Sequence, residues 1–467
     1  MKKRLQRILI GGCAAVMVLA MCSCGGQQET PESSAEPSEY NFGGMTITIA
    51  DQWGRDMTPG VDEKTNAFIE KVRKVEQKYN IKFEWKKIDS GTYWNDMATR
   101  ITGGDPFGDI LYSFPWMITD WIKAGAVKDA GAIAESVGID FRDGSWNKTV
   151  LDEHTYNQVI YGFSKAEETL SCGLLYNKRL FREAGLTDPN ELIANGQKWD
   201  FTTMEEYARK LTLRNPSTGQ TTQWGLSSSD PCWLMTNFIL SNGGSIVDYN
   251  TESGVPGFTM GSAKSLEGLD VFNRMLNIDQ TIYFCPVGGS WDTTPKAFAN
   301  GTVGMYHAAE WLVEYIRDLM AENGTSEDYG LTYFPAGPGA ADYLDQTTGG
   351  SAYFIPACIS DEKARAALLV FSELMDLSDD GDTREQRLTH TAEALFSDEA
   401  SVKVYLDLMM NGKIVRNGVS RVGLREVMME MAAEFTMDAG TAKSIVEQYT
   451  KYAGSMIAES GYASCFQ

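Results

Sequence analysis

The alternation of short strands and longer helices in the first quarter of the chain most constrains its fold. Strands are predicted where apolar and polar residues alternate, and helices where apolar residues recur every three or four positions. These rules place strands at residues 45–50, 81–85 and 109–112, with helices ending near residues 79 and 101. A strand–helix–strand–helix–strand order indicates a parallel sheet with crossover helices on its faces.

The rest of the chain continues this α/β style. Short strands are predicted at residues 159–163, 173–176, 224–226, 304–306 and 330–333, and helices at residues 177–184, 204–213, 361–375, 398–410, 424–435 and 441–457. Gly185 ends the first of these helices, and Thr202 or Thr203 is expected to cap the second. No repeat and no membrane-spanning segment is apparent in this part of the chain, so we expect an α/β protein of two or more lobes.

The composition excludes several classes of function. The 467 residues carry a formal net charge of −22, which argues against binding nucleic acid or anionic lipid through a basic surface. Mutual repulsion favours a monomer. Aromatic residues make up 11% of the chain, enough to fill cores and still line a binding surface.

The first 26 residues have the pattern of a secretory signal. A basic head with Lys2, Lys3, Arg4 and Arg7 precedes an apolar run over residues 8–21, too short to span a membrane. The exit, residues 22–26 (CSCGG), resembles a bacterial lipoprotein box, which implies a lipid-carrying cysteine. We favour Cys24, with Cys22 as the alternative. Residues 1–23 would then be the signal peptide and residues 24–42 a disordered tether, which predicts an extracytoplasmic protein anchored to the membrane by lipid.

Metal and cofactor chemistry is not expected. The five cysteines beyond the signal are far apart and form no CxxC motif, and the three histidines are isolated. Residues 376–382 resemble the front half of a calcium-binding loop. Arg387 occupies the position that would need a bidentate Glu, so an acidic loop between helices is the favoured interpretation and calcium the alternative.

Several segments share their order and spacing with one known family. Residues 103–112 (GGDPFGDILY) lead into the third strand, and residues 175–186 (LYNKRLFREAGL) follow a later strand; residues 123–127, 199–213, 242–244, 298–305 and 335–339 fit the same pattern. Together they resemble the extracellular solute-binding proteins of ABC importers, of the carbohydrate-binding class that includes maltose-type binding proteins. Two departures are the position of Pro106 and a long loop after the first strand that contains Trp53, and both leave the identity of the ligand open.

The resemblance implies a two-lobed fold similar to periplasmic binding proteins. Each lobe would be a mostly parallel sheet flanked by helices, with the ligand cleft between the lobes. The N-terminal lobe would comprise residues 43–168 plus about 353–395, and the C-terminal lobe residues 169–352 plus about 396–467. The C-terminal helices would pack mainly on the second lobe.

Candidate ligand-binding residues are those expected in loops at the carboxyl ends of strands, or at the crossovers between lobes. Aromatic rings stack on the apolar face of a sugar, and carboxylates accept hydrogen bonds from its hydroxyls. The candidates are Trp53, Trp116, Glu167, Glu168, Asp230, Trp233, Glu310, Trp311 and Tyr353.

The predicted function is a receptor that captures a mono- or oligosaccharide and delivers it to the transmembrane subunits of an ABC permease. No catalytic residue is assigned, because no GxSxG, HExxH or P-loop motif is present. Two alternatives stay open. The same fold could bind a peptide, a polyamine or another non-sugar solute, and a less favoured interpretation is an extracellular glycosidase acting through two opposed carboxylates.

Overall fold

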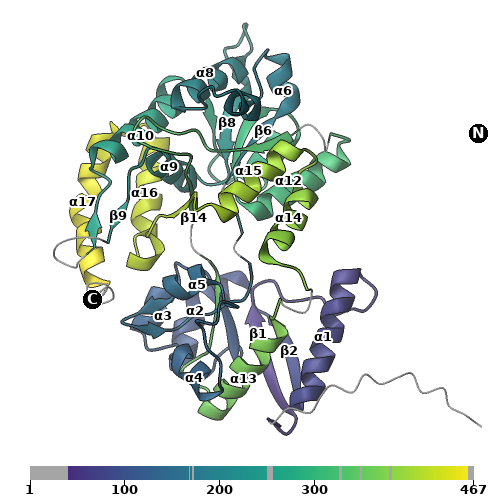
Figure 1. Cartoon of the computed structure of the whole chain (residues 1–467). Helices are drawn as coiled ribbons and strands as arrows, with labels where there is room; N and C mark the ends of the chain where they lie inside the picture. The colour runs from purple at the N-terminus through teal and green to yellow at the C-terminus, as the bar shows by residue number, and fades with distance from the viewer. Residues whose placement is uncertain are drawn as a thin grey trace, which may run out of the picture.

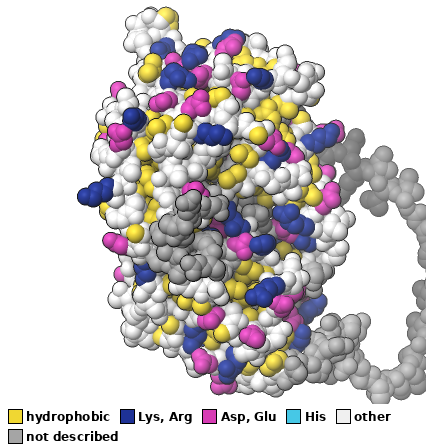
Figure 2. Space-filling model, turned by 60° about the vertical axis from the view of Figure 1, so that its left-hand side comes forward, with side chains coloured by type: hydrophobic (Ala, Val, Ile, Leu, Met, Phe, Trp, Pro, Cys, Tyr) yellow, Lys and Arg dark blue, Asp and Glu magenta, His cyan; other side chains and the backbone are white. Residues whose placement is uncertain are grey.

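The computed structural model describes residues 40–167, 169–170, 173–249, 256–325, 329–347, 350–377 and 381–460. They form two α/β lobes, with the N-terminal lobe below and the C-terminal lobe above in Figure 1. Lys and Arg side chains are interspersed with Asp and Glu on the face shown in Figure 2. Within the described ranges, no helix combines the length and the apolar character needed to cross a membrane.

The first lobe is built on a four-stranded sheet in the order β15-β3-β1-β2. Strand β1 (Met45–Asp51) runs parallel to β2 (Ile81–Lys87) and to β3 (Ile110–Ser113), whereas β15 (Ala352–Phe354) runs antiparallel to β3. The lobe also contains a short hairpin of β4 (Thr155–Tyr156) and β5 (Val159–Ile160). Its helices are α1 (Glu63–Tyr79), α2 (Ser90–Thr102), α3 (Ile118–Lys123), α4 (Ala130–Ser136), α5 (Lys148–Glu153) and α13 (Asp361–Leu374).

Helix α1 shows how the sequence builds this lobe. Asp62 caps its first turn by accepting a hydrogen bond from the backbone N–H of Thr65 at 2.6 Å. Val72, Val75 and Tyr79 are buried from its apolar face. Tyr79 also stacks on Phe42, with the ring centroids 6.3 Å apart. The packed fold therefore includes Phe42, which we expected to belong to the tether.

The second lobe is built on a five-stranded path in the order β11-β8-β12-β6-β13, with β7 (Leu213–Arg214) paired to β8. Strand β8 (Thr221–Ser228) runs parallel to β11 (Ile282–Tyr283) and to β12 (Val303–Ala308). Strand β6 (Gly173–Asn177) runs antiparallel to β12 and to β13 (Tyr329–Thr332). Two small ladders pair β9 (Val247–Asp248) with β10 (Gly257–Phe258), and β14 (Asp345–Thr347) with β16 (Ile414–Arg416).

Helices from the middle and the end of the chain surround the second sheet. They are α6 (Lys178–Glu183), α7 (Pro189–Ala194), α8 (Phe201–Leu211), α9 (Pro231–Ser241), α10 (Ala263–Asn273), α11 (Thr293–Ala299), α12 (Glu310–Glu322), α14 (Arg384–Leu395), α15 (Glu399–Met410), α16 (Arg425–Thr436) and α17 (Ala442–Glu459). A π-helical turn, η1 (Arg274–Ile278), continues α10, and a 3-10 turn, η3 (Ser420–Val422), precedes α16. The cap of α8 is Asp200, which accepts from the N–H of Thr203 at 3.0 Å, so our expectation of a threonine cap was wrong.

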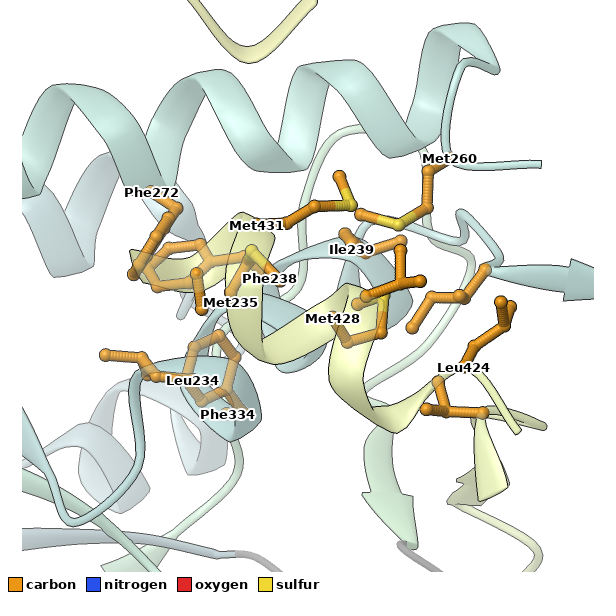
Figure 3. Packing of buried hydrophobic residues seen from close by; sticks show 14 of the residues in the cluster. Leu234, Met235, Phe238, Ile239, Met260, Phe272, Phe334, Leu424, Met428 and Met431 are labelled. Atoms are coloured by element: carbon orange, nitrogen blue, oxygen red, sulfur yellow. The ribbon is translucent and has the colours of Figure 1, made fainter. Parts of the chain in front are cut away.

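A methionine-rich core joins the C-terminal helices to the second lobe. Figure 3 shows Met428 and Met431 of α16 packed against Met235 and Phe238 of α9, with Phe272 of α10 beside them. All five side chains are buried. Unbranched, polarizable methionine side chains adapt to the gaps between helices that cross at different angles. From this packing we propose that the C-terminal helices belong to the second lobe.

Helix α14 lies on the second lobe. Its residues Leu388, Ala392 and Leu395 are buried in one cluster with Ile316 of α12 and Tyr405 of α15. In contrast, α13 packs on the first lobe, where Leu368 is buried in the same cluster as Ile47. We therefore propose that the first lobe ends between α13 and α14, earlier than the boundary near residue 395 that the resemblance implied.

The chain crosses between the lobes three times. On the first lobe, the residues that flank the first and second crossovers lie side by side, because Phe163 and Tyr353 form an antiparallel bridge. The third crossover lies between α13 and α14. It is tied to the first by Arg387 of α14, whose Nε donates to Oε1 of Glu167 at 2.8 Å. These ties hold described residues that flank the three crossovers close to one another.

Candidate functional site

The carboxyl ends of the parallel strands in both lobes point toward the crossovers. In the first lobe, Ala352 at the start of β15 pairs with Ser113 at the end of β3, so the second crossover enters beside this edge of the sheet. In the second lobe, Gly173 at the start of β6 pairs with Ala308 at the end of β12. Loops at carboxyl ends are where α/β sheets bind ligands, so the two edges form the candidate site.

A pocket of about 250 Å³ opens at this edge of the first lobe. Its lining comes from β1, the following loop, α1, β2, β3, β15 and α13: Ile49, Asp51, Trp53, Gly54, Arg55, Phe68, Trp85, Tyr112, Tyr353, Phe371, Leu374 and Met375. Two of our candidates, Trp53 and Tyr353, are among them. The structure adds Asp51 and Tyr112, whose positions at the ends of β1 and β3 were the signal that could have identified them.

Asp51 organises the mouth of this pocket. Its Oδ1 accepts hydrogen bonds from the backbone N–H groups of Trp53, at 2.8 Å, and of Gly54. Gly54 has a φ of +70°, a left-handed conformation that favours glycine, and this turn presents Trp53. The indole of Trp53 is 53% exposed, and its ring centroid lies 5.0 Å from that of Tyr112 in an edge-on contact. Trp53 therefore offers an open ring face beside an aspartate.

Two tyrosines contribute hydroxyl groups to the same edge. Tyr112 and Tyr353 contact each other edge-on, with ring centroids 5.4 Å apart, and Tyr353 rests on Phe371 at 4.6 Å. Burial raises the pKa of Tyr353 to about 12 and that of Tyr112 above its usual value. Both hydroxyls are thus protonated at neutral pH and can donate hydrogen bonds to a solute.

Trp116, another candidate, lies between an aromatic ring and a cation. Phe114 stacks on its ring at a centroid distance of 5.6 Å and an interplanar angle of 6°. The guanidinium of Arg425, from the second lobe, lies over the ring at 4.6 Å from the centroid. The ring therefore makes a contact between the lobes, a cation–π interaction across the candidate site.

Exposed aromatic residues also mark the facing edge of the second lobe. Trp311 lies in the first turn of α12, directly after β12, and is 53% exposed. Trp291, which was not among our candidates, is 60% exposed, and its ring centroid lies 5.9 Å from that of Trp311. Trp291 also contacts Tyr315 at 5.1 Å. Trp291 lies in the turn between β11 and α11, and this loop position is the feature that could have identified it as a candidate.

Asp230 and Trp233 lie at the same edge, at the start of α9. Oδ1 of Asp230 caps the helix by accepting from the N–H groups of Cys232 at 2.7 Å and Trp233 at 3.4 Å. Burial raises the pKa of Asp230, partly offset by these bonds and by the charge of Arg425. Trp233 is half-buried, and its carbonyl accepts a hydrogen bond from Gln346. Asp230 thus positions α9 and Trp233.

The acidic candidates at the crossovers are engaged within the protein. Oε2 of Glu310 accepts from the N–H of Leu170 at 2.9 Å and from the hydroxyl of Tyr405 at 2.7 Å. Glu167 pairs with Arg387 and lies 3.4 Å from the Nε of Arg384. We infer that both carboxylates hold the crossovers in place. Glu168 and Cys24 lie outside the described residues.

The described part of the chain contains no cluster of three or more His, Cys, Asp or Glu side chains able to hold a metal ion. Arg387, expected to oppose calcium in the acidic loop, is bound to Glu167 instead. Among the described residues, the candidate site offers ring faces on both lobes, and the hydroxyl donors of Tyr112 and Tyr353 and the carboxylate of Asp51 on the first lobe. Such a surface suits the reversible binding of a polar solute that has apolar faces.

A family model described as bacterial extracellular solute-binding protein matches residues 59–371, about two thirds of the chain. The chain belongs to this family. No match was found among functionally curated proteins. The recognition of a solute-binding protein from the sequence is therefore confirmed, and the two-lobed α/β fold agrees with it.

Solved structures of solute-binding proteins share this fold at low sequence identity. The GacH receptor of Streptomyces glaucescens, studied with acarbose, is 15% identical with a TM-score of 0.62, covering 89% of this chain and 99% of that one. The maltose/maltodextrin-binding domain MalE from Bdellovibrio bacteriovorus, bound to maltotriose, is 15% identical with a TM-score of 0.60, covering 89% and 100%. UgpB from Mycobacterium tuberculosis, in complex with glycerophosphocholine, is 14% identical with a TM-score of 0.62, covering 89% and 99%.

Proposed function

We propose that this solute-binding protein captures a mono- or oligosaccharide between its two lobes and delivers it to the transmembrane subunits of an ABC permease. The observation that carries the proposal is the pair of half-exposed tryptophans at facing sheet edges, Trp53 on the first lobe and Trp311 on the second. Aromatic faces stack on the apolar face of a sugar ring, and Asp51 supplies a carboxylate for its hydroxyls.

In this proposal the protein binds its solute reversibly and does not change it covalently. A solute stabilises the closed arrangement through contacts that it makes with both lobes at once. The crossovers between the lobes supply the hinge for that closure. The sugar-bound proteins of this fold support a saccharide as the solute. Because the chain is acidic, cationic solutes such as polyamines should also be tested.

The decisive experiment is a thermal-shift screen of the mature protein against glycans, polyols, peptides and polyamines, followed by calorimetry. A bound solute raises the melting temperature by mass action. Trp311→Ala should weaken saccharide binding by at least ~1 kcal/mol, because truncating a stacked aromatic residue typically costs that much. Binding of only peptides or polyamines would refute the saccharide, and products of glycan cleavage would make the protein a glycosidase.

The lipid anchor is tested separately, in a bacterial host that lipidates exported proteins. Two acyl chains hold a protein on a membrane stably. Cys24→Ser should therefore move the protein from the membrane fraction to the soluble fraction, whereas the matched variant Cys22→Ser should stay with the membrane. The reverse result would assign the anchor to Cys22.

A further inference from the structure

We propose that residues 416–425 of the second lobe form a clasp that holds the two lobes together beside the candidate site before any solute binds. The clasp runs from Arg416, the last residue of β16, through η3 to Arg425, the first residue of α16. It contacts α3, α5 and the loop after β3 of the first lobe. The inference goes beyond the proposed function, because it concerns the solute-free protein.

An ion-pair group forms the first contact of the clasp. Arg416 donates through Nη2 to Oδ2 of Asp152 in α5 at 3.3 Å, and its Nε lies 3.9 Å from Oε1 of Glu153. The Glu153 side chain is only 7% exposed. Buried charges in proteins are stabilised by opposite charges, so moving the lobes apart would take a stabilising cation away from this carboxylate.

A hydrogen bond and a cation–π interaction form the other two polar contacts. The hydroxyl of Thr119 in α3 donates to the carbonyl oxygen of Ser420 in η3 at 3.4 Å. Arg425 lies over Trp116, as described above. Partly exposed contacts of this kind each shift an equilibrium by about fivefold or less. Because one segment makes all of them, the same movement of the lobes breaks them together.

Apolar packing accompanies the polar contacts. The turn η3 packs on α3. Val422 of η3 and Ile118 of α3 are both 1% exposed and belong to one hydrophobic cluster, which also contains Val150 of α5. Parting the lobes at the clasp would therefore expose apolar surface to water, which is unfavourable.

The clasp is fixed to the second lobe. Strand β16 runs parallel to β14, the strand before the second crossover. The hydroxyl of Tyr249 donates to the carbonyl oxygen of Gly418 at 2.9 Å, and Nδ2 of Asn417 donates to Oε1 of Gln346 in β14 at 3.4 Å. The clasp therefore moves with the second lobe, so any rotation of that lobe acts on its contacts with the first.

The clasp favours closure without covering the ring faces proposed for the solute. Trp53 and Trp311 are each 53% exposed, whereas Val422 of the clasp is buried. The apparent affinity for a solute scales with the fraction of molecules that are already competent to bind it. By holding the lobes near each other the clasp raises that fraction, so its loss should weaken solute binding.

The test is small-angle X-ray scattering of the solute-free protein. Arg416→Glu turns the ion pair into a repulsion and should increase the radius of gyration, and Thr119→Val should increase it less. Lys148→Glu is the matched control, because Lys148 pairs with the same Asp152 at 2.6 Å but within α5 of the first lobe. This control makes the same change in net charge and should leave the radius unchanged. In calorimetry with the solute that the screen selects, Arg416→Glu should weaken binding about tenfold, and Lys148→Glu should not.

Three results overturn the inference. The first is an unchanged radius in both Arg416→Glu and Thr119→Val, each folded by circular dichroism. The second is an equal increase of the radius in Lys148→Glu, since net charge would then be its cause. The third is tighter solute binding by Arg416→Glu, which would mean that the segment opposes closure. If no solute binds the wild type, the proposed function fails, whereas the scattering experiment still decides on the clasp.

Discussion

Removing the Glu310 side chain should lower the free energy of unfolding without changing the affinity for the solute. Its Oε2 accepts two hydrogen bonds in a half-buried setting, from the Leu170 N–H and the Tyr405 hydroxyl. Hydrogen bonds to a charged group contribute about 1.5–3 kcal/mol each, and a donor left unpaired in the interior adds a penalty of about 1–3 kcal/mol. Burial opposes this gain by raising the pKa of Glu310, which disfavours the charged form. We therefore expect Glu310→Ala to cost on the order of 3 kcal/mol.

The matched variant is Glu310→Gln. Because one oxygen accepts both bonds, the amide oxygen of Gln can replace it, and the loss should stay within about 1 kcal/mol. Urea unfolding followed by circular dichroism gives the free energies of both variants, and calorimetry gives their affinity for solute. Wild-type stability in Glu310→Ala would refute the reasoning. So would a selective loss of solute binding in Glu310→Gln, which would return Glu310 to the binding site.

Three further predictions concern other parts of the chain. Burial lowers the pKa of His154 from 6.5 to about 4, so the unfolded chain binds a proton that the folded protein does not. The free energy of unfolding should therefore fall by about 3 kcal/mol as the pH drops from 6.5 to 4. His154→Gln should flatten this pH dependence in urea titrations at several pH values. Arg425 contacts Trp116 across the lobes, and removing this cation–π contact in Arg425→Ala should lower the free energy of unfolding by only about 0.5–1 kcal/mol. The same variant should increase the radius of gyration of the solute-free protein in small-angle scattering. An unchanged radius would contradict the inter-lobe role of the contact. A Cβ at Gly225 would lie 2.3 Å from the carbonyl oxygen of Ala208, so Gly225→Ala should lower the free energy of unfolding by about 3 kcal/mol. Gly454 in α17 has open space around the position of a Cβ. Gly454→Ala should therefore raise the free energy of unfolding by about 1 kcal/mol in the same urea assay, because Ala favours the helix.

The periodic elements were predictable from the sequence because local patterning dictates them. Residues 45–50 and 361–375 correspond to β1 and α13 within a residue or two at each end. Strands 159–163 and 224–226 were less accurate, since β5 spans Val159–Ile160 and β8 spans Thr221–Ser228. Short strands are defined by their neighbours in the sheet, and those neighbours lie far away in the chain.

The roles of individual site residues were harder to predict. Glu310 and Trp311 are adjacent in the sequence, but the fold directs the carboxylate toward Tyr405 of α15 and leaves the indole half-exposed. Trp116 meets a cation more than 300 positions later in the chain. Neither partner can be read from local composition, because each depends on how the helices of the second lobe pack. The positions of Trp53 and Trp311 after β1 and β12 were predictable, since strand ends are visible in the sequence, and their role in binding stays a prediction.

The late return of β15 to the first lobe has a consequence for how the protein forms. The sheet partner of Ser113 is Ala352, so the first lobe lacks an edge strand and α13 until most of the second lobe has been synthesised. Pairings between such distant residues slow folding, because a long loop must close before they contribute. The first lobe therefore cannot complete its sheet during synthesis, and we expect its folding to be the slow step after the whole chain has emerged.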